Sequence, residues 1–434
     1  WNTNTITNNK ITASDATSGD MFGLAVSISG KYAIVGAYKA NNNTGKAYIY
    51  ELNTMSGTWS EVHKLSPTGN SINKFGTSVS ISGDYAIIGA YAETMVNSTT
   101  GAAYIFERNV STGLWSSVHT QKISSDDSMG NNFGHSVSIS GDYAVCGAYG
   151  HATPNNSGAI YVFQRNNSSG VWEHKHKIRA NTPAEKERFG YAVAIDSDRI
   201  VVGTEDVGNV DIHDVYVYER DPITGNWPAT HTAKLGPDVN TPAPNTPAGT
   251  DSFGRHVAIS GDYIVISSTE PGYNGRNKIY VFERHETTGW PTTETARLVS
   301  GYNTTWQDYG GRTEEGWSSG VSIHGNRVVT TSRYGTGMVH VFERDELTGW
   351  PSTETFTIVP TTDVVDYTSW SAAVGEYGAF VGSGGDDTVS ANAGAIFIIN
   401  PVLSSYTDLN SLTLYPPATI SLDGNTLAIE NNMG

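Results

Sequence analysis

One stretch, FGTSVSISGDYAIIGAY at Phe75–Tyr91, limits the folds available to this chain because the sequence repeats it. The copies at Trp317 and Trp370 replace Phe-Gly by Trp-Ser, and the copy near the end is incomplete. Further copies, of varying similarity, begin at Phe22, Phe133, Phe189, Phe253, Trp317, Trp370 and Ala418. A fixed internal period is the signature of proteins that grow by adding copies of one unit, so we expect a repeat architecture.

Each copy opens a unit in which the sequence predicts four strands. In the first unit, Val26–Ser29 alternates apolar and polar residues, and the Gly30 that follows allows a tight turn because glycine tolerates positive φ. The nearly continuous apolar run at 32–38 predicts a strand buried on both faces. Aromatic residues alternate with β-branched ones at 48–52, and a fourth strand begins at Trp59. Each unit is therefore expected to be a four-stranded antiparallel meander.

A single meander cannot bury both of its faces, whereas meanders stacked around an axis can. Such a ring leaves only short strand edges, and it is the architecture of an all-β β-propeller. The aromatic residues of the third strands are then expected to fill the space between blades instead of binding a ligand; these residues are Phe106, Phe163, Phe282 and Phe342.

The two ends of the chain carry parts of one further unit, and this bears on the number of blades. We interpret 1–434 as a single propeller domain in which 22–407 holds seven repeats. Residues 1–11 match the fourth strand of a unit, and 408–434 match the last outer strand followed by the first two strands of a composite blade. Joining the ends would protect an open sheet edge, so we favour eight blades, with seven as the alternative.

With these units in view, the chain resembles the FG-GAP repeats of the integrin α-subunit head. The resemblance rests on the recurring Phe-Gly, Ser-Val-Ser-Ile-Ser-Gly-Asp and Gly-Ala-Tyr. The Tyr-Val-Phe-Glu-Arg and Trp strands are similar to a variety found in many extracellular microbial proteins. The resemblance covers nearly the whole chain and implies the propeller fold. It implies little about molecular function, because propellers serve adhesion, carbohydrate binding and catalysis alike.

The resemblance also raises the question of metal ions, since several integrin repeats carry a calcium loop between their first two strands. Here that connection is only Ser-Gly-Asp or an equivalent, and calcium takes about six to eight oxygen ligands. We therefore predict no cofactor and no integrin-type calcium site. A weaker cation site is conceivable in one loop of the fourth unit, which contains Asp206, Asn209, Asp211 and Asp214.

Composition and sequons bear on location. The net charge of −17 argues against a nucleic-acid partner, and no apolar run is long enough to insert into a membrane. Seven N-x-S/T sequons fall in predicted loops, which favours a secreted or cell-surface glycoprotein. The sequon asparagines are Asn42, Asn97, Asn109, Asn155, Asn166, Asn167 and Asn303.

The longest predicted loops, 235–253 and 298–317, lie in the fourth to sixth units, and the second contains aromatic residues in a polar context. Exposed aromatic side chains supply contact area at low entropic cost. A recognition patch is one interpretation, and aromatics that fold back over a blade edge are the other. The candidate binding residues are Tyr273, Tyr302, Trp306, Tyr309 and Arg312.

We predict a module for protein–protein interaction, in adhesion or in the assembly of a surface or filament structure. Its expected partners are other extracellular proteins or copies of this chain, with glycans as a further class. The alternative is a lectin, which predicts similar pockets around the ring, and the unlike long loops count against it. An enzyme would need convergent Asp, Glu or His on the first strands. These carry Ser, Val, Ala and Ile, so we predict no catalytic residue and no enzymatic activity.

Overall fold

The computed structural model describes residues 6–67, 73–95, 98–126, 131–150, 157–180, 188–205, 214–236, 253–269, 277–299, 320–331, 339–358, 371–385, 391, 393–401, 418–423 and 426–431. The chain divides by its contacts into a large unit, Thr7–Asn400, and a small one of Trp1–Ile6 with Pro401–Gly434. That residues 1–434 form one domain stays a prediction.

Seven four-stranded antiparallel sheets form the blades, which we number in the order of their first strands. Blade 1 contains β2 (Phe22–Ser29), β3 (Tyr32–Ala37), β4 (Lys46–Asn53) and β5 (Thr58–Leu65), with the short turn α1 (Ala40–Asn43) between β3 and β4. Blade 2 contains β6 (Val79–Ser82), β7 (Tyr85–Ala90), β10 (Ala102–Glu107) and β11 (Gln121–Ile123), with a small hairpin of β8 (Thr94–Met95) and β9 (Ser98–Thr99). Blade 3 contains β12 (Ser136–Ser140), β13 (Tyr143–Ala148), β14 (Ala159–Arg165) and β15 (Trp172–Ile178).

The remaining blades repeat this order. Blade 4 contains β16 (Ala192–Asp196), β17 (Arg199–Gly203), β18 (Val215–Glu219) and β19 (Ala233–Leu235). Blade 5 contains β20 (Val257–Ser260), β21 (Tyr263–Thr269), β22 (Asn277–Glu283) and β23 (Ala296–Val299). Blade 6 contains β24 (Val321–His324), β25 (Arg327–Thr331), β26 (Val339–Glu343) and β27 (Phe356–Ile358). Blade 7 contains β28 (Ser371–Gly375), β29 (Gly378–Ser383), β30 (Ala395–Pro401) and β1 (Ile6–Ile11).

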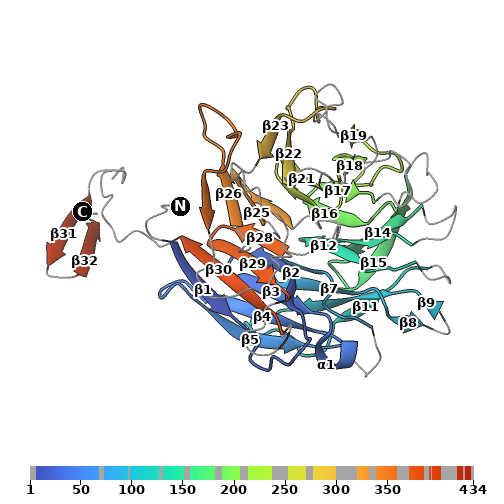
Figure 1. Cartoon of the computed structure of the whole chain (residues 1–434), viewed down its shortest axis with the longest axis horizontal. Helices are drawn as coiled ribbons and strands as arrows, with labels where there is room; N and C mark the ends of the chain where they lie inside the picture. Colours follow the sequence, from blue (N-terminus) through green and yellow to red (C-terminus); the bar gives the residue numbers. More distant parts are fainter. Residues whose placement is uncertain are drawn as a thin grey trace, which may run out of the picture. The chain divides into compact units, whose positions relative to one another are not determined.

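The blades surround a central axis, with their first strands innermost (Figure 1). Neighbouring first strands contact each other in the cycle β2, β6, β12, β16, β20, β24 and β28, and β28 contacts β2 again. This closed cycle confirms the all-β propeller. We call the end of the ring that holds the Phe-Gly residues the FG end, and the opposite end, with the tight turn between first and second strands, the turn end.

The preference for eight blades is wrong, because the N-terminal strand completes the seventh blade. β1 pairs with β30, in the outer place that 408–434 was expected to supply. The junction between blades 7 and 1 also repeats the others. Gly394 forms a parallel bridge with Phe22, as Gly45 does with Phe75. β31 (Ala418–Asp423) and β32 (Thr426–Asn431) pair with each other in a two-stranded sheet, so they add no eighth four-stranded blade.

The Phe-Gly and Gly-Ala pairs form the contact between successive blades. Phe75 is fully buried, and its ring packs edge-on against Tyr104 at 5.4 Å between centroids. Gly76 has φ of 91°, in the region that favours glycine. Gly36 of the preceding blade lies so close that a Cβ there would meet the carbonyl oxygen of Gly76 at 2.1 Å. The motif is therefore explained by close backbone approach between blades.

A second contact between blades joins Tyr, Arg and Trp residues toward the turn end. The guanidinium of Arg108 lies 5.1 Å from the centroid of the Tyr32 ring in the preceding blade. Trp115 packs edge-on against the same ring at 5.9 Å. The Tyr85, Arg165 and Trp172 set, and the Tyr143, Arg220 and Trp227 set, repeat the arrangement. The aromatic residues of the third strands predicted to be core are buried, as expected; these are Phe106, Phe163, Phe282 and Phe342.

Candidate functional site at the axial channel and the FG end

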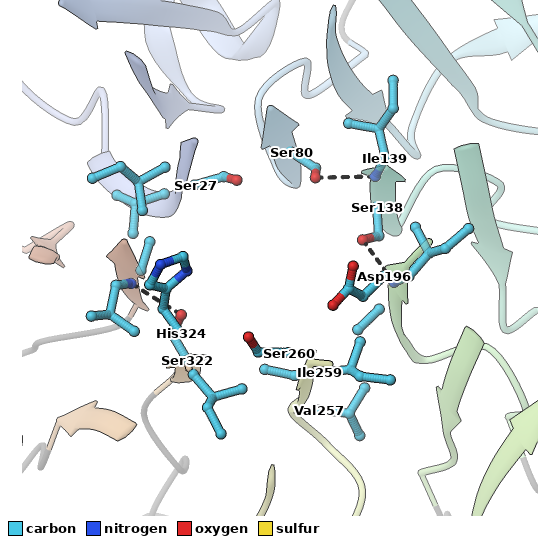
Figure 2. Close-up of a pocket in the computed structure, with 18 of the residues that line it drawn as sticks. Ser27, Ser80, Ser138, Ile139, Asp196, Val257, Ile259, Ser260, Ser322 and His324 are labelled. Carbon is cyan, nitrogen blue, oxygen red and sulfur yellow. Dashed lines mark hydrogen bonds between the residues drawn. The ribbon is translucent and has the colours of Figure 1, made fainter. Parts of the chain in front are cut away.

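The innermost strands line an axial cavity of about 420 Å³, which we call the axial channel. Figure 2 shows side chains from blades around the ring arranged about this opening. Most are aliphatic or serine, because the first strands alternate these two kinds of residue. Among the described residues that line the cavity, Asp196 and His324 are the titratable ones. The centre of the ring is therefore a mostly uncharged, hydroxyl-bearing surface.

The serines of the first strands hold neighbouring blades together. Ser80 Oγ accepts a hydrogen bond of 3.1 Å from the backbone N–H of Ile139, and Ser138 Oγ accepts one of 3.1 Å from Ile195 (Figure 2). Innermost strands have an unpaired edge, so these hydroxyls satisfy N–H groups that no further strand could bond. Ala194 and Ala258 replace the serine in blades 4 and 5. The channel hydroxyls of blades 1 to 3 thus serve the scaffold.

We expect Ser80→Ala to lower the free energy of unfolding by about 1 kcal/mol, because the N–H of Ile139 loses its acceptor at a buried position. Ser138→Ala should have a similar effect through Ile195. Urea denaturation of both variants measures this. Ser111→Ala serves as control, because Ser111 lies in an exposed turn and makes its hydrogen bond through the backbone N–H. Equal stability of all three variants would contradict the role given to the channel serines.

The turn end of the channel departs from the serine pattern. Asp196 and His324 occupy the position of Ser82, and Figure 2 shows their side chains on opposite sides of the opening. The Asp196 carboxylate accepts hydrogen bonds from the N–H of Gly261 at 2.7 Å and from the Ser197 hydroxyl at 3.1 Å. The Asp196 side chain therefore holds the next blade as the serines at its position do.

The FG end carries aromatic and basic side chains. The tyrosines that follow Gly-Ala at the end of the second strand, Tyr38, Tyr91 and Tyr149, are all partly exposed there. The residue before Phe-Gly in the next blade turns its side chain onto such a ring. Lys74 Nζ lies 5.9 Å from the centroid of Tyr38, and the Arg188 guanidinium lies 5.2 Å from that of Tyr149. The structure thus repeats a tyrosine–cation pair between successive blades.

These basic residues have a strained backbone. φ is 54° at Lys74 and 48° at Arg188, where side chains other than those of Gly, Asn and Asp are uncommon. The equivalent Asn132 has φ of 55°, so the conformation belongs to the turn and not to the residue type. Strained positions of this kind cluster at functional sites, and an observed outlier is a legitimate reason to suspect one.

Blades 3 to 5 add histidines and a buried carboxylate to this end. His135 packs against Tyr149 at 4.6 Å and Tyr191 at 4.8 Å between ring centroids. Glu205 is 6% exposed and pairs with Arg188 and, at 2.7 Å, with Arg255. Tyrosines, histidine and paired arginines therefore form a continuous surface. We call it the FG-end rim; its members are Tyr38, Lys74, Tyr91, His135, Tyr149, Arg188, Tyr191, Glu205 and Arg255.

Two histidines at the FG end, one of them in the rim, are held neutral. Burial lowers the pKa of His135 to about 4, which Arg188 reinforces and a hydrogen bond with the Tyr191 carbonyl opposes. Burial also lowers the pKa of His256 to about 4, and Arg255 and His135 act in the same direction. A histidine in an unfolded chain has a pKa of about 6.5. Both side chains are therefore expected to be uncharged in the folded protein at neutral pH.

The depressed histidine pKa values predict a loss of stability in mild acid. Between pH 6.5 and about 4 the unfolded chain binds protons that the folded chain excludes, so stability falls as pH falls through this window. The loss is at most about 3 kcal/mol per histidine, and partial exposure reduces it. Urea unfolding at pH 7 and pH 4.5 measures it. His135→Thr and His256→Ser, the residues that blade 2 carries at these positions, should flatten the dependence; an unchanged slope would contradict this cause.

All five sequence-predicted binding residues lie outside the described residues: Tyr273, Tyr302, Trp306, Tyr309 and Arg312. The same holds for Asp206, Asn209 and Asp211 of the weak cation candidate. Asp214 is described, and its carboxylate pairs with Lys234 at 2.6 Å. Within the described part of the chain, no group of three or more His, Cys, Asp or Glu residues is arranged to hold a metal ion.

Some of the sequon asparagines lie outside the described residues and the others lie within them. Asn97, Asn155 and Asn303 lie outside the described residues. Asn42, Asn109 and Asn167 are exposed, and Asn166 is partly exposed. Asn109 Oδ1 accepts hydrogen bonds from the N–H groups of Ser111 and Thr112, which shapes the turn between the third and fourth strands. Asn166 makes the same turn but also donates its amide to Glu173 at 2.9 Å. Asn109 is the better placed of these two for modification.

Sequence reasoning missed the FG-end rim, although a signal for it was present. The residues on either side of each Phe-Gly vary between copies while the motif itself is constant. Lys74, Asn132 and Arg188 precede it, and His135 and Tyr191 follow it. Variation beside an otherwise fixed repeat is what a binding surface on a common scaffold would show.

The fold and its inner strands define a seven-bladed β-propeller, and comparison with known proteins gives the family. The FG-GAP repeat matches residues 7–50, 59–106, 118–163, 172–218 and 243–282, which together make up more than half of the chain. The chain therefore belongs to the FG-GAP repeat family. Among proteins with curated annotation, none matches its sequence.

Solved structures support the fold alone. A Bacteroides uniformis protein, provisionally named a 6-phosphogluconolactonase, is similar with a TM-score of 0.50 and 12% identity over 78% of this chain and 85% of its own. A Lactobacillus plantarum protein is similar with a TM-score of 0.50 and 13% identity over 82% of this chain and 90% of its own. The periplasmic gluconolactonase of Pseudomonas aeruginosa has a TM-score of 0.48 and 12% identity over 77% and 85% of the two chains. Among the described residues, no helix has the length and apolar character that crossing a membrane requires.

Proposed function

We propose that this propeller is an extracellular, N-glycosylated binding or structural module that joins a partner through its FG end. The partner is another extracellular protein or a further copy of this chain, in adhesion or in the assembly of a surface structure. The observation that carries the proposal is the FG-end rim, where partly exposed tyrosines and basic side chains form one surface across successive blades. Tyrosine and arginine are the residues that interfaces favour.

The channel supports a binding role better than a catalytic one. The Ser80 and Ser138 hydroxyls already accept hydrogen bonds from the next blade, and the Asp196 carboxylate does the same. That the chain is not an enzyme is part of the proposal, and hydrolytic activity of the purified protein would overturn it.

Location is proposed from the exposed sequons. Glycopeptide mass spectrometry of the protein from its natural source should find a glycan on Asn109, and unmodified asparagine at every sequon would contradict the proposal.

Partner binding is tested by capture from the extracellular fraction of the source organism. Tyr149→Ala combined with Tyr191→Ala removes the centre of the rim, where the two rings lie 5.4 Å apart between centroids. Ile223→Ser combined with Leu347→Ser is the matched control, because these side chains are 93% and 95% exposed in turns at the other end of the ring. Wild type and control should retain the same partner and the rim variant should lose it. Retention by all three would overturn the FG end as the binding face.

A second candidate, the lectin, gains one observation in its favour. A lectin predicts similar pockets around the ring, and the unlike long loops counted against that. The tyrosine–cation pair between blades, formed by Tyr38 with Lys74 and by Tyr149 with Arg188, is a repeated feature that does not depend on those loops.

A further inference from the structure

Two lysines at the FG end lack the carboxylate partner that other lysines of this chain have. Lys39 Nζ and Lys74 Nζ lie 5.5 and 5.9 Å from the centroid of the same ring, that of Tyr38. In the described part of the chain, neither ammonium has a carboxylate within ion-pair distance. By contrast, a carboxylate oxygen lies 2.6–2.9 Å from Nζ of each of Lys31, Lys46, Lys122, Lys175 and Lys234.

This arrangement is unusual for a chain with a net charge of −17. Each of the two ammonium groups lies near the Tyr38 ring, and an anion that reached either of them would gain a favourable charge interaction. Lys74 is also held in place. Its Nζ donates a hydrogen bond of 2.8 Å to the Tyr91 hydroxyl, and its ring contact with Tyr91 is 5.0 Å to the centroid. The site is thus preorganised, with two cations and two phenols.

The backbone of Lys74 has the positive φ that this turn also has at Met21, Asn132 and Arg188. Its N–H donates to the Asn43 carbonyl at 3.0 Å, and its own carbonyl accepts from the Thr77 hydroxyl at 2.7 Å. These bonds fix φ at 54°, which asparagine tolerates better than lysine. Stability alone would favour asparagine here, as in blade 3 at Asn132.

The aromatic rings continue from this site along the rim. Tyr91 packs against His135 at 5.6 Å, and His135 packs against Tyr149 at 4.6 Å between centroids. Tyrosine rings stack on the apolar faces of sugars, and ammonium groups bind carboxylates. A ligand with both sugar rings and carboxylates can contact the tyrosine rings as well as the lysine ammonium groups. An acidic peptide would contact the ammonium groups and leave the tyrosine rings unused.

We propose that Lys39, Lys74, Tyr38 and Tyr91 bind the carboxylate of a uronic acid unit in an acidic glycan, whose neighbouring sugars lie along the FG-end rim. This inference rests on the proposed function and deepens it, because the acidic glycan would be one that the extracellular partner carries to the same face. It adds no covalent chemistry, since both lysines act as cations and hydrogen-bond donors.

The test uses trigalacturonate as probe and isothermal titration calorimetry on the full chain. Lys74→Asn should weaken binding at least about tenfold, the effect of losing one charge-assisted contact. The same variant should leave the unfolding midpoint unchanged or slightly higher, because asparagine suits the backbone. Lys39→Gln combined with Lys74→Asn should abolish measurable binding. Lys175→Gln removes a lysine that is already paired with Glu173, and it should bind as wild type does.

Each outcome decides the proposal. Wild-type binding of trigalacturonate, with no binding of neutral galactotriose and with loss in the Lys74→Asn variant, supports it. Tighter binding of hexaglutamate than of trigalacturonate overturns the glycan assignment in favour of an acidic peptide. Equal weakening by Lys175→Gln, or no binding by wild type, overturns the site. Partner capture through Tyr149 and Tyr191 is a separate measurement, so failure of this inference does not imply failure of the proposed function.

Discussion

Replacing Gly36 by alanine is expected to prevent correct packing of blade 1 against blade 2. A Cβ at this position would meet the Gly76 carbonyl oxygen at 2.1 Å and its carbonyl carbon at 3.0 Å. These are backbone atoms of the neighbouring blade and have no side-chain freedom with which to move aside. The free energy of unfolding should fall by at least about 4 kcal/mol, the range in which single substitutions become exceptional. Urea denaturation of the soluble fraction, together with its yield, measures the effect.

Gly30→Ala is the matched control in the same blade. Position 30 also favours glycine, because φ of Gly30 is 52°. No atom, however, lies within 4 Å of a Cβ built there. Only the backbone strain remains, so the loss should be about 1 kcal/mol. If the two alanine variants are equally stable, close approach between blades is not what requires glycine at position 36.

Removal of residues 1–12 is expected to leave blade 7 without its outer strand and to destabilise the protein. β1, with six residues, is the outer strand of that sheet, and its Ile11 packs against the core cluster that contains Ile396, Ile398 and Phe380. The truncated chain would lose the hydrogen bonds to β30 and leave its edge exposed. Each bond is worth about 1 kcal/mol net, so we expect a loss of about 4 kcal/mol and a tendency to aggregate. Thermal unfolding followed by circular dichroism, with size-exclusion chromatography, measures both.

Two controls show whether the strand acts through blade 7. A synthetic peptide of residues 1–12, added to the truncated chain, should restore much of the lost stability, and a scrambled peptide should not. Truncation after residue 401 removes β31 and β32 and should leave the ring almost unaffected, because the seven sheets are complete without them. A larger effect from the C-terminal than from the N-terminal truncation would contradict the role of β1 as the strand that completes blade 7.

The repeated sequence predicted the blades well because each of its features acts locally. Alternation of apolar and polar residues sets which side of a strand is buried, and the glycine of the turn sets where a hairpin closes. Phe106 and Phe163 could be placed in the core from their period alone, and both are buried. The weaker copies at Phe189 and Phe253 kept the same register, as did the Trp-Ser copy in blade 6.

The candidate site was predicted less well, because it depends on which residues of different blades meet. Lys39 and Lys74 are 35 residues apart in the sequence, yet both ammonium groups lie near the ring of Tyr38. Nothing in the period indicates that the residue before Phe-Gly adopts positive φ and turns toward the preceding blade. The aromatic loop that sequence reasoning favoured, with Trp306 and Tyr309, lies outside the described residues, so that prediction stays open.

The sequence by itself determined the meander, its strand order and the glycines at the contact between blades. Those properties follow from the side-chain period and from the backbone freedom of glycine within about fifty residues, and each repeat contains the same pattern. The tertiary structure alone decided which end of the chain completes blade 7. Residues 1–11 and 418–431 both resemble parts of a blade, so the repeat pattern does not choose between them. Geometry selects β1 because the cycle of first strands is already closed by the contact of β28 with β2, so blade 7 lacks only an outer strand.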